Sequence, residues 1–99
     1  MNDAEHKHLE RIKSMGCVVC RNLGYITLRD AVECEAHHLT SGGRRMGHYY
    51  CIPLCHLHHR SYIDDEKLVS RHPWKKEFEK RYGTELELLE QTNKELEGL

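Results

Sequence analysis

The chain has 99 residues, the size of a single domain, and it includes 5 Cys and 9 His. Only 38% of its residues are hydrophobic, so a domain this small is expected to add a metal ion or another cross-link to its core. The net charge of −1 is unevenly distributed, because residues 36–82 carry nine basic and five acidic side chains. No stretch approaches the roughly 20 apolar residues of a membrane span, and the polar N-terminus is not typical of a secretory signal. We therefore expect a cytoplasmic protein whose cysteines are metal ligands or free thiols rather than disulfides.

The pattern of apolar residues, glycines and prolines predicts an α+β fold in one domain, residues 1–99. We divide it into an N-terminal helical segment (1–15), a central core (16–82) and an acidic C-terminal helix (83–99). Gly16 and Gly83 are expected to end helices, and Thr84 with Glu87 forms a predicted capping box. The elements predicted within the core are strands at 25–28, 31–38 and 48–54, a loop at 39–47, and helices at 54–62 and 73–82.

The two predicted helices of the core and the C-terminal helix each carry apolar residues at helical spacing. In the first, Leu54, Leu57 and Ile63 are expected to face the core. The residues expected to face the core from the other two helices are Trp74, Phe78, Tyr82, Leu86, Leu89 and Leu96.

Two ligand pairs at short spacing predict a structural metal site. Cys17-x2-Cys20 and Cys55-x2-His58 each offer two ligands from a tight turn, and tetrahedral zinc needs four. A redox CxxC motif would prefer a thioredoxin-like βαβ context, which the sequence does not indicate. His56 and His59 also lie close to Cys55, but the spacing favours His58 as the fourth ligand.

Two further cysteines, Cys34 and Cys51, each fall on a predicted strand. Pairing of these strands could bring them together in a second metal site. The other interpretation, which we favour, is that both are small buried residues.

His37 and His38 stand next to each other at the end of a predicted strand. One can bind a metal ion while the other keeps a free imidazole, which is a good general base near neutral pH. This combination suits a hydrolase that activates water beside a metal ion. Two exposed histidines would be the ordinary alternative.

The order of these pieces resembles the HNH endonucleases and their ββα-metal core. The matching segments are CVVC (17–20), CEAHHL (34–39), GG (42–43), IPLC (52–55) and HH (58–59). Within that superfamily, GGRRMGHYYCIPLCHLHH followed by RHPWKKEFEKRYGTE is similar to the phage recombination enhancement function proteins, which are RecA-dependent nucleases. The resemblance implies a small, zinc-stabilised ββα-metal core with flanking helices. It also implies DNA as substrate, a RecA filament as partner, and a phage or prophage gene in a bacterial host.

The resemblance also assigns roles to the remaining histidines. It makes His38 the general base and His37 and His59 metal ligands, and His72 could complete the site. The central Asn of the HNH pattern is missing, and either Tyr50 or His48 stands in its place. We favour His48, which can bind a metal ion or orient a base. The implied catalytic ion is Mg²⁺, Mn²⁺ or Zn²⁺, and a histidine-rich site favours a transition metal.

Basic residues beside the predicted site are candidates for phosphate contacts. Arg44 and Arg45 lie in the glycine-rich loop, Arg60 follows the second histidine pair, and Lys75 and Lys76 begin a helix. The leading interpretation is a metal-dependent DNA endonuclease that hydrolyses phosphodiester bonds. The alternative is a non-catalytic zinc-binding module that holds DNA or protein.

Overall fold

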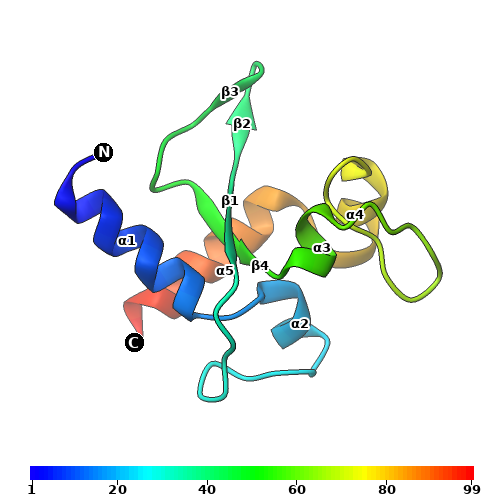
Figure 1. Cartoon of the computed structure of the whole chain (residues 1–99), viewed down its shortest axis with the longest axis horizontal. Helices are drawn as coiled ribbons and strands as arrows, with labels where there is room; N and C mark the ends of the chain where they lie inside the picture. The colour runs from blue at the N-terminus through cyan, green and yellow to red at the C-terminus, as the bar shows by residue number, and fades with distance from the viewer.

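The computed structural model describes all residues 1–99 and has an α+β architecture, as predicted (Figure 1). Its elements are α1 (Asp3–Ser14), α2 (Val18–Asn22), β1 (Glu35–His38), β2 (Thr40–Ser41), β3 (Arg44–Arg45), β4 (Cys51–Leu54), α3 (His56–Arg60), α4 (Lys75–Tyr82) and α5 (Glu85–Glu97). The β1–β4 pair lies at the centre, α5 crosses behind it, α1 lies on one side, and α3 and α4 lie on the other. None of the helices combines the length and the apolar character that a membrane span requires.

The central sheet consists of β1 and β4, which pair antiparallel with His37 opposite Ile52 and His38 opposite Cys51. Both strands are shorter than predicted, and the strand expected at 25–28 does not form. A β-strand needs a second strand to pair with, and residues 25–28 pair with no other strand. The predicted loop at 39–47 contains a second, two-stranded pair, β2–β3, which projects from the body of the molecule.

The larger apolar core gathers side chains from β4, α2, α4 and α5, with Phe78 fully buried and Trp74 and Tyr82 packed against it, as predicted. Leu57 and Ile63 were expected in the core but are 49% and 38% exposed. The short helix α3 instead turns His58 and the partly buried His59 inward, so Leu57 points outward. Leu57 and Ile63 are therefore corrections to the predicted core.

Helix α5 begins as predicted, because Glu87 N donates to Thr84 Oγ1 (3.1 Å) and Thr84 N donates to Glu87 Oε1 (2.9 Å). Leu89 and Leu96 are buried as expected, but Leu86 is 64% exposed, and the buried face runs through Leu88 instead. Helix α5 is also held against α2 by polar contacts. The buried Arg21 guanidinium donates to both carboxylate oxygens of Glu95 at 2.8 Å.

Candidate metal centres

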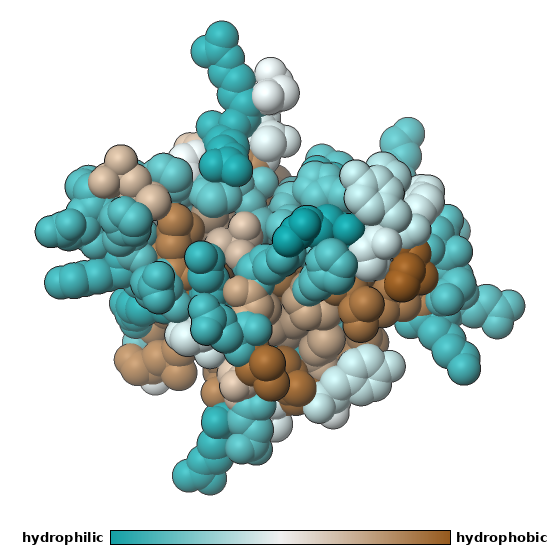
Figure 2. Space-filling view, in the orientation of Figure 1, coloured by the Kyte–Doolittle hydropathy of each residue, from teal (hydrophilic) through white to brown (hydrophobic).

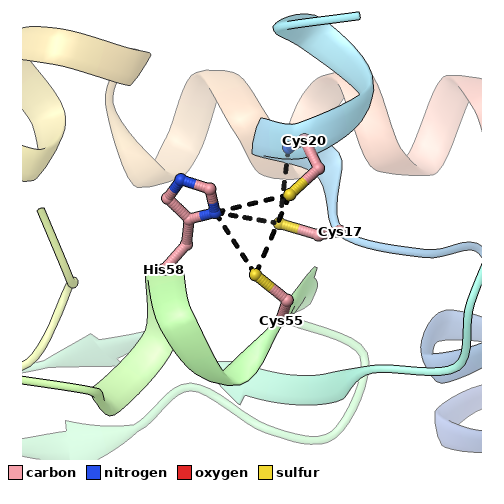
Figure 3. A group of neighbouring side chains, drawn as sticks. All are labelled: Cys17, Cys20, Cys55 and His58. Carbon is pink, nitrogen blue, oxygen red and sulfur yellow. Dashed lines mark hydrogen bonds between the residues drawn. The ribbon is translucent and has the colours of Figure 1, made fainter. Parts of the chain in front are cut away.

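Cys17, Cys20, Cys55 and His58 converge on one point, where their ligand atoms all lie within 4.8 Å of one another (Figure 3). Cys17 and Cys20 come from the start of α2, and Cys55 and His58 come from the start of α3. Nδ1 of His58 is 3.3 Å from Cys55 Sγ, 3.5 Å from Cys20 Sγ and 3.7 Å from Cys17 Sγ. The geometry thus selects His58 as the fourth member, and His56 is exposed.

These distances match the edges of a zinc tetrahedron. Zinc–sulfur bonds of about 2.3 Å and zinc–nitrogen bonds of about 2.0 Å place tetrahedral ligands about 3.8 Å apart for two sulfurs and about 3.5 Å apart for sulfur and nitrogen. Cys20 Sγ and Cys55 Sγ are 3.8 Å apart. A hydrogen bond with Cys17 lowers the pKa of Cys55 to about 3, whereas the same hydrogen bond raises the pKa of Cys17 and burial raises the pKa of Cys20 to about 11. The spacing of these atoms and the donor set of three sulfurs and one imidazole nitrogen fit a metal ion such as zinc.

The other two cysteines do not meet. Cys51 pairs with His38 at one end of the β1–β4 ladder, whereas Cys34 precedes the opposite end. Cys51 is fully buried and its thiol donates to the carbonyl oxygen of His48 at 3.2 Å. Cys34 is half-buried and its thiol lies 3.5 Å from the carbonyl oxygen of Lys13. A second site built on these two residues is therefore ruled out by the strand register.

A second group of potential ligands consists of His37, His59 and His72, which we call the histidine triad. His37 lies on β1, His59 lies on α3, and His72 lies in the segment before α4. Nδ1 of His37 and Nε2 of His59 are 3.2 Å apart. This distance is close to the roughly 3.3 Å expected between two nitrogens at about 2.0 Å from a tetrahedral zinc ion. Three imidazoles can thus bind a metal ion and leave positions open for water and substrate.

Behind the triad lie two glutamates that the sequence reasoning missed. Glu35 Oε1 is 2.8 Å from His59 Nδ1, and Glu85 Oε1 is 3.4 Å from His37 Nε2. Glu35 had a detectable signal, because it lies two residues before His37 and alternate strand residues share a face. No sequence pattern indicated Glu85, because its place beside His37 depends on how helix α5 packs.

Each of these carboxylates also forms an ion pair with an arginine. The hydrogen bond from Arg60 lowers the pKa of Glu35 to about 2, with a further contribution from His59. Burial alone raises the pKa of Glu85, but the nearby His37 imidazole and the hydrogen bond from Arg71 outweigh it and lower that pKa to about 2. Both side chains are therefore carboxylates at neutral pH.

His38 and His48 lie together but outside the triad. His38 directly follows His37, and successive strand residues point to opposite faces. His38 Nε2 is 3.1 Å from His48 Nδ1, so one ring donates and the other accepts. Burial, with Arg45 and His48, lowers the pKa of His38 to about 4. The imidazole of His38 is therefore neutral at pH 7, and burial makes it a weaker base than a free imidazole. The fourth predicted metal ligand, His48, contacts the predicted base instead of the triad.

The predicted phosphate contacts differ in their surroundings. Arg44 and Arg45 are exposed on β3, and Figure 2 shows hydrophilic side chains projecting where the β2–β3 pair lies in Figure 1. Lys75 and Lys76 are exposed at the start of α4. Arg60 instead donates to Glu35 Oε2 at 2.6 Å, so its guanidinium is paired within the chain.

Comparison with known proteins supplies the family. The sequence matches the family described as "Recombination enhancement, RecA-dependent nuclease" over residues 2–97. No curated protein matches the chain. The matched range includes the cysteine–histidine cluster, the histidine triad, His38 and both exposed arginines of β3. The chain therefore belongs to the family of RecA-dependent nucleases of recombination enhancement.

Proposed function

We propose that this protein is a metal-dependent DNA endonuclease of the HNH type that acts on RecA-bound DNA. The observation that carries the proposal is the histidine triad, whose three imidazoles can hold a metal ion and leave ligand positions open, and His38 directly follows the triad's His37 on β1. An antiparallel strand pair followed by a short helix supplies two of the triad ligands, which is the order of a ββα-metal core. The cysteine–histidine cluster would hold a structural zinc ion that ties α2 to α3.

In this proposal each group has one task. His38 accepts a proton from the attacking water, and His48 orients the ring of His38 through their 3.1 Å contact. His37, His59 and His72 hold a divalent ion, which when bound polarises the phosphate and stabilises the leaving oxygen. The exposed Arg44 and Arg45 hold the DNA backbone, and Lys75 and Lys76 extend this contact.

The direct test is cleavage by the purified, zinc-loaded protein. We expect it to cut DNA when Mg²⁺ or Mn²⁺ and a RecA filament on single-stranded DNA are supplied together. Omission of RecA, and separately of the divalent ion, provides the two controls. If the complete mixture never yields cut DNA although the protein binds it, the non-catalytic binding module becomes the better explanation.

Removing the two arginines of β3 should weaken DNA binding without changing the fold. Each phosphate contact contributes about one unit to the slope of log affinity against log salt concentration. We therefore expect the Arg44→Ala, Arg45→Ala double variant to lower that slope by about 2 in a fluorescence anisotropy titration. Arg29→Ala, which removes an exposed arginine from the loop before β1, is the matched control. An unchanged slope in the double variant would place the DNA elsewhere on the molecule.

A further inference from the structure

The imidazoles of the triad can bind an ion only if the correct ring nitrogen is free. A neutral imidazole carries its proton on one nitrogen and offers the other as the ligand. Nδ1 of His37 and Nε2 of His59 face each other at 3.2 Å, so an ion bound between them requires the proton of each ring on its other nitrogen. Those two nitrogens, His37 Nε2 and His59 Nδ1, are the ones that face Glu85 and Glu35.

The contact at His59 has the geometry of a hydrogen bond. Its Nδ1 lies 2.8 Å from Glu35 Oε1, and the two side chains are only 12% and 30% exposed. A carboxylate can accept a hydrogen bond but cannot donate one, so Glu35 favours the ring form with the proton on Nδ1. That form leaves the Nε2 lone pair pointing toward His37, where an ion would lie.

The carboxylate of Glu35 is itself held in place. Arg60 donates from Nε to Glu35 Oε1 at 3.0 Å and from Nη2 to Glu35 Oε2 at 2.6 Å. Such a two-pronged pair fixes both the position and the plane of the carboxylate. Arg60 is therefore placed to support Glu35 rather than to reach outward to phosphate.

The same arrangement occurs a second time. Glu85, only 6% exposed, accepts from Arg71 and lies 3.4 Å from Nε2 of His37. That nitrogen is buried and makes no hydrogen bond, and Glu85 is the carboxylate that faces it. Two histidines of the triad, His59 and His37, thus each lie beside a glutamate, and each glutamate is paired with an arginine.

We infer that Glu35 is a positioning residue, which holds His59 in the ring form that binds the metal ion and is itself held by Arg60. This inference rests on the proposed function of the triad. Glu35 is well placed for the task because it shares a face of β1 with His37. One short strand thus delivers a ligand and the partner of a second ligand.

The test is metal binding by the Glu35→Gln variant of the full chain, with one equivalent of zinc bound in the cysteine–histidine cluster. Co²⁺ is the probe, because its visible spectrum distinguishes histidine ligands from thiolate ligands. Loss of an outer carboxylate partner typically weakens metal binding 10- to 100-fold, and we expect the Co²⁺ dissociation constant to rise by about that factor. Glu33→Gln, which alters an exposed carboxylate two residues earlier, should bind Co²⁺ as the wild type does.

A second readout needs neither the second metal ion nor activity. In the zinc-loaded protein without Co²⁺, ¹⁵N NMR should find the His59 proton on Nδ1 in the wild type and shared between both nitrogens in Glu35→Gln. Arg60→Gln keeps Glu35 but removes the guanidinium that holds its carboxylate, so a smaller, few-fold weakening of Co²⁺ binding is expected. This variant also carries the test if Glu35→Gln does not fold. Wild-type Co²⁺ affinity in both variants, with unchanged His59 protonation, would overturn the inference.

The two proposals can fail separately. A wild-type protein that binds Co²⁺ through histidines but cuts no DNA would overturn the nuclease proposal and leave the role of Glu35 intact. A wild-type protein that cuts DNA while Glu35→Gln binds Co²⁺ normally would overturn the role of Glu35 alone.

Discussion

Replacing His38 with alanine should abolish DNA cleavage while the protein stays folded and keeps its zinc. A general base typically contributes 10²- to 10⁴-fold to a reaction rate, so we expect at least about a 100-fold loss. Its replacement should not disturb the cysteine–histidine cluster, because His38 lies on β1 opposite Cys51 and contacts His48 instead. The measurement is the single-turnover cleavage rate on RecA-coated DNA, together with circular dichroism and zinc content.

His56→Ala is the matched control, because His56 is an exposed histidine at the start of the ligand-bearing helix. It should cleave DNA at the wild-type rate. Full activity of His38→Ala would remove His38 from the reaction. In that case, His48, whose Nδ1 lies 3.1 Å from His38 Nε2, is the next candidate for the base.

Replacing Cys17 with serine should unfold the chain or nearly so. Structural zinc contributes roughly 10–16 kcal/mol of apparent binding free energy, whereas a small domain has a net stability of about 5–15 kcal/mol. Cys17 is 2% exposed and its sulfur lies 3.7 Å from His58 Nδ1, so serine would leave an incomplete, buried ligand set. We expect loss of the cooperative thermal transition and of the bound zinc, and a strong chelator should have the same effect on the wild type.

Cys34→Ser tests whether any cysteine would have the same effect. Cys34 is half-buried and lies outside the cysteine–histidine cluster, so this variant should retain zinc and a thermal midpoint close to that of the wild type. If Cys17→Ser melts like Cys34→Ser and still holds its zinc, the cluster does not stabilise the fold. A chelated wild-type protein that keeps its cooperative transition would lead to the same conclusion.

Local sequence patterns predicted the structure correctly where the interacting residues lie within one short segment. The capping box at Thr84 formed because its partners are three residues apart. Prediction was weaker for which apolar residues of a helix are buried. Leu57 and Leu86 have the spacing of a buried face, but α3 and α5 use a neighbouring face instead. Periodicity indicates that a helix has an apolar side, but packing decides where that side ends.

The sequence by itself determined the two ligand pairs of the cysteine–histidine cluster, the histidine pair on β1 and the family of the chain. These features depend on spacings of a few residues, which the backbone converts directly into geometry. Only the tertiary structure decided that His72 joins His37 and His59, and that His48 contacts His38. It also decided that Glu35 and Glu85 lie behind the triad. These partners come from separate elements, and their meeting depends on how β1, α3 and α5 pack, which no local spacing specifies.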